Sequence, residues 1–416
     1  MGEQSLLPNL FRTEYRKIVS VLCSTFGIDH IEIAEDIVSD TFLTATESWS
    51  ISGTPENPTA WLYTVAKNKS KNYFKRDSLF YQKISTEIKY SYSEYEEFEI
   101  DLSQKNIVDS QLAMMFTVCN PSISKDSQIS LALNLLCGFG TQEIADAFLI
   151  SKEVVYKRLQ RAKEKLKKQK IKIEQPSVLQ INTNLDTVLT TLYLLFSEGY
   201  YSTSTNTVLR QDLCYEAIRL TSTLTENKAT NTPTANALLS LMYFHSSRFN
   251  ARFNEQGESI LYEDQDDTLW NNDLIEEGIK HLNQSASGHF LTKFHLEAAI
   301  AYWHTRKRDT DEKWENILQL YNQLLQIEYS PIAALNRTFA FAKVRGKSSA
   351  IPEAEKLNLP DNPFYYSLLG HLYQEIDYLK SKQNFEEALR LSNSNPVSHT
   401  LKKYIRILEE KINTSK

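Results

Sequence analysis

Cysteine, glycine and proline are scarce in this chain of 416 residues, and each scarcity excludes a class of protein. The four cysteines, Cys23, Cys119, Cys137 and Cys214, stand far apart and form no Cys-x-x-Cys pair. We therefore expect buried, reduced thiols, and neither disulfides nor a thiolate metal site. Only 11 glycines and 11 prolines occur, which favours helices over sheets. The composition predicts an all-α fold.

Long apolar runs and targeting signals are also missing. No run of about 18 apolar residues is present, so we expect no membrane span. The first residues, MGEQSLLPNLF, lack a basic stretch followed by an apolar core, so we expect no secretion signal. Together these absences predict a cytoplasmic protein.

Motifs for catalysis and for metal binding are absent as well. Five of the eight histidines lie between His245 and His304, in no spacing that suits zinc. The acidic run 263–267 lacks the central glycine of a calcium loop. With no glycine-rich phosphate loop and no recognisable nucleophile–base pair, we expect no enzyme activity, metal or cofactor. An enzyme built on the C-terminal half, using the acids of 263–267, is an alternative.

Positive charge, by contrast, is concentrated in one short segment. Residues 140–168 have the pattern of two helices joined by a tight turn, with Thr141 and Ser151 expected to cap them. The apolar face of the second helix is formed by Val155, Leu159, Ala162 and Leu166. From Lys152 to Lys172 the chain has ten Lys or Arg and two Glu, a balance of +8 in a chain of net charge −6. Such a helix suits DNA; a solvated basic face on an ordinary helix pair is the alternative.

The first 50 residues predict two amphipathic helices, over 8–26 and 29–49. The outer face of the second helix is acidic and consists of Glu32, Glu35, Asp36, Asp40 and Glu47. Plain solubilising charge is the alternative to a binding role for this face.

A polar loop over 50–59 and a basic helix over 60–75 follow. The helix interleaves Lys and Asn with aromatic residues, which suits single-stranded DNA because cations follow phosphates and rings stack on bases. For Trp61 and Phe74 we expect core packing instead. Residues 79–105 are rich in Glu, Asp and Tyr and predict an acidic linker, after which helices resume over 106–120 and 125–136.

These segments together resemble the extracytoplasmic-function (ECF) sigma factors of bacterial RNA polymerase. Residues 1–78 resemble region 2 of that family, and residues 106–172 resemble its region 4. The region 2 motifs are Ala34-Glu35-Asp36 to Phe42 and Asn57-Pro58-x-Ala60-Trp61-Leu62. The region 4 motifs are Thr141-x-Glu143-Ile144-Ala145 and Val155-x-x-Arg158-Leu159. Ser39 and Asn72 depart from the residues usual in the family.

The resemblance implies a subunit that binds core RNA polymerase and promoter DNA, with a helix-turn-helix on the −35 element and region 2 on the melted −10 strand. The residues implied for polymerase contact are Glu35, Asp36, Asp40 and Phe42. Those implied for the −10 strand are Asn57, Trp61, Lys67, Asn68, Lys71, Asn72 and Lys75. Those implied for the −35 element are Lys152, Glu153, Tyr156, Lys157, Arg158, Gln160 and Arg161. The acidic linker is implied to thread the polymerase cleft.

Residues 177–416 predict a further series of helices. The motif Tyr366-x-x-Leu369-Gly370-x-x-Tyr373, followed by Phe385 and Ala388, resembles one degenerate tetratricopeptide (TPR) repeat. Segments 192–200, 212–220, 263–266 and 335–337 resemble the C-terminal extension of one sigma-factor subgroup. We expect a TPR-like regulatory domain that docks on the sigma modules in cis or binds an unknown protein or ligand. A helical scaffold with incidental DNA affinity is the alternative function.

Overall fold

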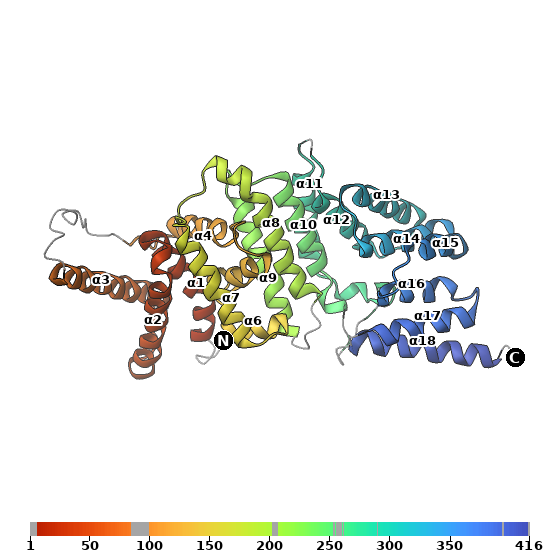
Figure 1. Ribbon diagram of the computed structural model, residues 1–416, viewed down its shortest axis with the longest axis horizontal. Coiled ribbons are helices and arrows are strands. Elements are labelled where there is room, and N and C mark those ends of the chain that lie inside the picture. Colours follow the sequence, from red (N-terminus) through yellow and green to blue (C-terminus); the bar gives the residue numbers. More distant parts are fainter. Residues whose placement is uncertain are drawn as a thin grey trace. The chain divides into compact units, whose positions relative to one another are not determined.

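The computed structural model describes residues 6–84, 100–201, 207–252, 254, 260, 262–288, 290–392 and 395–414. Throughout these ranges the regular structure is helical and contains no strand (Figure 1). The predicted all-α fold is therefore confirmed. All four cysteines are buried, and no helix in the described part of the chain combines the length and apolarity that a membrane crossing requires.

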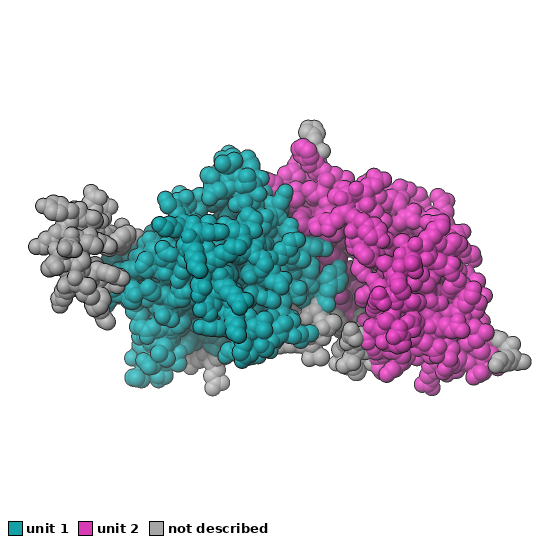
Figure 2. All heavy atoms as spheres, viewed as in Figure 1, with its two compact units in different colours: residues 1–230 teal, residues 231–416 magenta. Residues whose placement is uncertain are grey.

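Two compact units divide the chain, residues 1–230 and 231–416 (Figure 2). The helices of the first unit are α1 (Leu6–Phe26), η2 (Ile28–His30), α2 (Ile31–Ser52), α3 (Pro58–Ile84), α4 (Gln104–Val118), α5 (Lys125–Leu131), η3 (Ala132–Leu136), α6 (Thr141–Phe148), α7 (Lys152–Lys168), α8 (Val178–Tyr200) and α9 (Thr207–Glu226). Those of the second are α10 (Pro233–Ser246), η4 (Phe249–Ala251), η5 (Tyr262–Asp264), η6 (Asp267–Leu269), α11 (Asn272–Ser285), α12 (Lys293–His304), α13 (Asp311–Ile327), α14 (Pro331–Arg345), α15 (Lys347–Leu357), α16 (Pro363–Tyr373), α17 (Tyr378–Leu391) and α18 (Asn395–Thr414).

Helix α1 organises the first unit. Its apolar side chains Ile18, Val19 and Leu22 are completely buried, and the helix packs against α2, α3 and α4. The sequence places α1 in the region 2 module and α4 in the region 4 module, and the two lie in one compact unit. Helices α8 and α9 belong to the same unit, whose end at residue 230 lies beyond the sequence-based boundary at 172–177.

The helix expected over 60–75 is longer in the structure. It begins at Pro58 and ends at Ile84, so it takes in the first part of the segment assigned to the acidic linker. Helix α4 takes in the last two residues of that segment. The linker residues 85–99 lie outside the described part of the chain.

The second unit consists of successive packed helices. Contacts join α10 to α11, α13 to α14, and α16 to α17 and then α18, the last three of which run side by side in Figure 1. Gly370 of α16 faces the fully buried ring of Phe385 in α17, where a Cβ atom would lie only 2.7 Å from the ring carbons Cδ1 and Cε1. The small residue in this motif thus allows two helices to approach closely.

Candidate nucleic-acid interface

The helical pair α6–α7 contains the segment of concentrated positive charge, which lies on α7. Leu149 has a left-handed backbone conformation, with φ of 52°, which ends α6 and turns the chain towards α7. The Ser151 hydroxyl caps α7 by accepting from the Val154 N–H, as the sequence predicted. The predicted Thr141 cap is wrong. Gly140 occupies the cap position of α6, and the Glu143 carboxylate accepts from the Gly140 N–H at 2.8 Å, so the backbone group is satisfied without Thr141.

Helix α7 has the two faces that its sequence predicted. The buried face consists of Val155, Leu159, Ala162 and Leu166. The exposed face includes Lys152, Glu153, Tyr156, Lys157, Gln160 and Arg161. Hydrogen bonds at the helix N-terminus, from its own backbone N–H and from the Ser151 hydroxyl, lower the pKa of Glu153. The exposed face therefore presents cations, one carboxylate, an amide and a phenol to a partner.

Arg158 differs from the other residues predicted at the −35 element. It is half-buried, with a guanidinium nitrogen 3.3 Å from the Asp126 carboxylate. The guanidinium also lies 5.7 Å from the centre of the Phe148 ring. These contacts connect α7 to α5 and α6, so Arg158 positions the helix within the pair.

Helix α3 carries the residues predicted for the melted −10 strand. The Asn57 side chain begins the helix by accepting from the Ala60 N–H at 3.0 Å. Lys67 is half-buried. The exposed members of the predicted set on the helix are Asn68, Lys71, Asn72 and Lys75.

Two aromatic side chains of α3 are half-buried and pack against rings of other helices. The Trp61 ring lies 5.4 Å from that of Trp49, and the Phe74 ring stacks on Phe26 at 3.7 Å. Both contacts agree with the core packing expected for these two rings. Trp61 was also in the predicted −10 set, and its ring is engaged with α2 in the structure.

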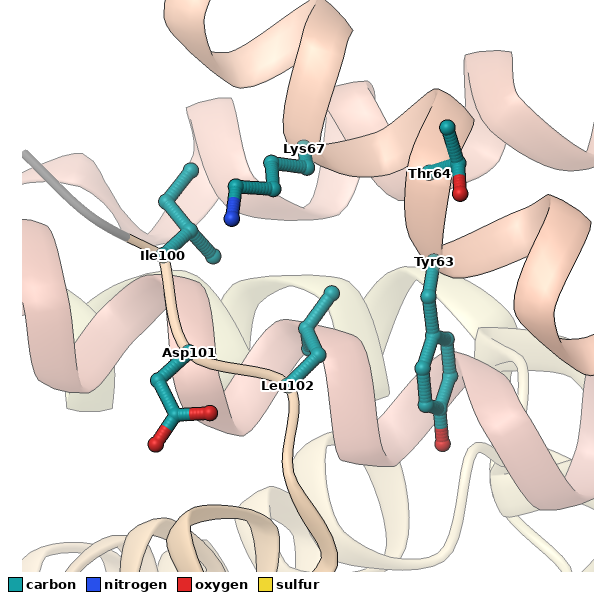
Figure 3. A pocket seen from close by; sticks show the side chains of 6 residues that line it. All are labelled: Tyr63, Thr64, Lys67, Ile100, Asp101 and Leu102. Atoms are coloured by element: carbon teal, nitrogen blue, oxygen red, sulfur yellow. The ribbon is translucent and has the colours of Figure 1, made fainter.

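A cavity of about 430 Å³ opens on the same helix (Figure 3). It is lined by Tyr63, Thr64 and Lys67 of α3 and by Ile100, Asp101 and Leu102 of the segment before α4. The Tyr63 hydroxyl donates to the Glu14 carboxylate at 2.6 Å, and burial together with this hydrogen bond raises the pKa of Tyr63. Sequence reasoning missed residues 100–102 as part of a site. These residues line the cavity because the chain folds back onto α3, and no local sequence pattern predicts that return.

Helix α2 holds the residues predicted for polymerase contact. Asp36 and Asp40 are exposed, and Asp40 pairs with Lys69 of α3 at 2.5 Å. Phe42 is only 4% exposed and packs against the rings of Phe11 and Tyr15 of α1. In this conformation the Phe42 side chain belongs to the core and is not presented to a partner.

Glu32 and Glu35 of α2 pair with lysines of α7. The Glu35 carboxylate lies 2.6 Å from the Lys163 ammonium, and Glu32 binds Lys167. Burial raises the pKa of Glu35 although Lys163 opposes the rise. For Glu32 burial acts in the same direction, but the hydrogen bonds from Lys167 and the backbone and the charges of Lys167 and Lys163 together outweigh it and lower the pKa.

Helices α8 and α9 connect to both predicted modules. Glu216 of α9 lies 2.5 Å from Arg16 of α1 and 2.8 Å from Arg219. Arg219 in turn donates to the Leu136 carbonyl at 2.7 Å. The Thr191 hydroxyl of α8 donates to the Gln128 side chain of α5 at 2.9 Å.

Comparisons with known proteins match two segments of the chain. Residues 10–79 match the family Sigma-70 region 2, and residues 184–286 match a family of unknown function, DUF6596. An uncharacterized protein of Rhizobium meliloti (strain 1021) is 29% identical over 373 residues, which is 88% of this chain and 87% of that protein. No solved structure matches the chain.

The region 2 match covers α1, α2 and most of α3, and therefore covers the residues predicted for the polymerase and for the −10 strand. It supports a sigma factor of the sigma-70 family that binds core RNA polymerase and promoter DNA in transcription initiation. The second match begins within α8, in the first unit, and fits a C-terminal extension of such a factor.

Proposed function

We propose that this chain is a sigma factor of the ECF type. It binds core RNA polymerase through α2, holds the melted −10 strand on α3 and reads the −35 element with α7. The observation that carries the proposal is the coincidence of the region 2 match, over residues 10–79, with the exposed Asn and Lys side chains of α3. Side chains of this kind suit an unpaired DNA strand. The protein contributes no chemistry of its own.

The −35 element is the target that suits α7. In a helix-turn-helix, the first residues of the second helix reach base edges and later ones reach phosphates. Tyr156 is 62% exposed, and Lys157 and Arg161 lie on the same exposed face. Because Arg158 is engaged with Asp126, we assign it to positioning the helix and not to a direct base contact.

The C-terminal extension sets the activity of the sigma modules in cis. Its first two helices, α8 and α9, support this role because Glu216 binds α1 and Thr191 binds α5. A segment that contacts both modules influences their relative arrangement. The resemblance favours an extension that is required for activity over one that only inhibits.

Selection of promoters from a random library tests this function. Purified chain and bacterial core polymerase are incubated with random duplex DNA, and the templates that yield transcripts are sequenced. We expect two conserved sequence blocks upstream of the start site, absent with core polymerase alone. Failure of the chain to bind core polymerase, or transcripts indistinguishable from those of core alone, would contradict the proposal and favour the scaffold alternative.

A further inference from the structure

A second cavity, of about 470 Å³, lies in the second unit, between the start of α10 and the end of α11. These two helices pack against each other. Residues 231–233 and Asn236 line the cavity together with Asn283, Gln284 and Ser287. Its volume is within the range of about 300–1,000 Å³ that is typical of small-molecule sites. The lining residues up to 284 lie within the DUF6596 match, which assigns them no role.

The lining of this cavity is polar but uncharged. None of its seven residues is acidic or basic, although charged residues make up 24% of the chain. Six of the seven carry an amide or a hydroxyl group, and the seventh is Pro233. A charged ligand would need an opposite charge to compensate for its desolvation. The lining therefore suits a ligand that is polar and neutral.

Asn236 is the buried and fixed part of the lining. It is only 3% exposed, and its Oδ1 lies 2.8 Å from Nδ1 of His281. Its amide nitrogen donates to the Asn231 side-chain oxygen at 2.6 Å and to the Thr232 carbonyl at 2.9 Å. Because Oδ1 of Asn236 can only accept, Nδ1 of His281 carries the hydrogen. Burial lowers the pKa of His281, so its ring is neutral at pH 7.

This chain of hydrogen bonds holds the Asn231 amide in one orientation before any ligand binds. Groups that are already ordered lose less conformational entropy on binding, which favours affinity. Asn231 itself is exposed at the edge of the cavity, whereas His281 lies behind the lining and is buried. We therefore regard His281 as a positioning residue that acts through Asn236.

The lining side chains offer both donors and acceptors. The Asn231 nitrogen and the Thr232 hydroxyl can donate, because their oxygens already accept hydrogen bonds from the protein. The Ser287 oxygen can accept, because its hydroxyl donates to a backbone carbonyl at 3.0 Å. The amide of Asn283 can do both.

Such a mixed set distinguishes between classes of ligand. Each hydroxyl of a sugar both donates and accepts, whereas an ionised carboxylate only accepts and an ammonium group only donates. The edges of a nucleobase are mixed as well, but its flat faces are usually covered by aromatic rings, and no aromatic residue lines this cavity. Adjacent hydroxyl groups on a small ring fit the lining best.

We propose that this cavity binds a small neutral polyhydroxy compound of the size of a monosaccharide. Asn231 and Thr232 donate to its hydroxyl groups, Ser287 accepts from one, and Asn283 does both. Binding at this cavity does not depend on the proposed sigma function. Since the cavity lies in the C-terminal extension, the same compound would supply a signal to the domain that we propose to set the activity of the sigma modules.

Saturation-transfer-difference NMR on the full chain tests the ligand class. The neutral probes are D-glucose, D-galactose, D-mannose, D-ribose and myo-inositol. D-glucuronate is the matched charged probe, because it is glucose with a carboxylate at one carbon, and adenine represents the nucleobases. We expect saturation transfer to at least one neutral probe, and weaker or no transfer to glucuronate and adenine. Transfer to none of the neutral probes, or stronger transfer to glucuronate or adenine, would overturn the proposal.

Substitutions in the lining test the location. Asn231→Ala and Asn283→Ala each remove one exposed amide, so both variants should keep the fold, which circular dichroism checks. Loss of one hydrogen bond should weaken binding of the best probe roughly three- to tenfold. Asn316→Ala, which removes an exposed amide of α13 outside the lining, is the matched control and should bind as wild type does.

The outcomes are separate from those of the proposed function. If the probe binds Asn231→Ala and Asn283→Ala as tightly as it binds Asn316→Ala, the ligand lies elsewhere and this cavity is overturned as its site. If the chain fails to bind core polymerase, the sigma assignment falls, but the NMR result is unaffected.

Discussion

The basic residues of α7 fall into two groups that differ in their surroundings and not in their charge. Lys157 and Arg161 are exposed, whereas Lys163 and Lys167 pair with acids of α2. We expect Lys157→Ala or Arg161→Ala to weaken promoter binding by about 1–3 kcal/mol, with relaxed specificity at one position, if the residue contacts a base edge. If it contacts only phosphate, the loss is uniform and the salt slope falls by roughly one.

Fluorescence anisotropy with labelled promoter duplexes over a range of salt concentrations measures both quantities. Lys168→Ala, an exposed lysine on the same helix, is the control for loss of charge. Unchanged affinity and salt slope in both Lys157→Ala and Arg161→Ala would contradict the −35 assignment.

A second residue-scale prediction concerns the packing of α16 on α17. In Gly370→Ala the new methyl group would meet the Phe385 ring at 2.7 Å, and that ring is fully buried. Overpacking of this kind costs about 1–3 kcal/mol, so the second unit should unfold at a lower urea concentration. Adding Phe385→Leu should recover part of the loss. Equal stability of Gly370→Ala and wild type would contradict this prediction, because it would mean that α16 and α17 accommodate the methyl group at no cost in stability.

Helix α2 allows an element-scale prediction about docking. Asp36 is exposed, and an exposed charge rarely decides stability. Asp36→Arg should therefore leave the circular dichroism and melting temperature unchanged but weaken capture of core polymerase. Glu47→Arg, at an exposed position nearer the C-terminal end of α2, is the matched control. Capture of core by Asp36→Arg at wild-type affinity would exclude docking through this face.

The contact between α1 and α9 gives a second element-scale prediction. The side chains of Arg16 and Glu216 are 7% and 14% exposed, so Glu216→Gln leaves a buried guanidinium without its carboxylate. Loss of one partner of a buried ion pair costs about 3–5 kcal/mol. Urea unfolding of Glu216→Gln, Arg16→Met and the double variant measures the coupling. Additive effects of the two substitutions would mean that the pair does not join α1 to α9.

The sequence predicted the helices of the candidate interface and their buried faces better than it predicted which helices contact one another. The pattern of Val155, Leu159, Ala162 and Leu166 determined which face of α7 is buried, because local spacing reports local amphipathicity. The pairing of Glu35 with Lys163 spans 128 residues, and nothing in either helix reports its partner. The ring contacts of Phe42 were not predictable for the same reason, since Phe11 and Tyr15 belong to another helix.

At the scale of the whole molecule, the structure changes where a truncation should be made. A chain that ends after Lys172 loses Thr191 and Glu216, which leaves Gln128 and Arg16 without these partners. A chain that ends after Thr230 keeps the entire first unit. We expect the longer fragment to unfold cooperatively and the shorter one to be less stable by several kcal/mol, consistent with the loss of a buried ion pair. Equal stability of the two fragments would show that α8 and α9 do not stabilise the sigma modules.

Run-off transcription tests the central claim most directly. The template carries a promoter obtained by selection with this chain, and the reactions contain core polymerase alone, core with the full chain, or core with the Asp36→Arg variant. The account predicts a transcript of defined length with the full chain, a strongly reduced amount of it with Asp36→Arg, and none with core polymerase alone. The same transcript from core polymerase alone, or no transcript from core with the full chain, would contradict the assignment of this protein as a sigma factor.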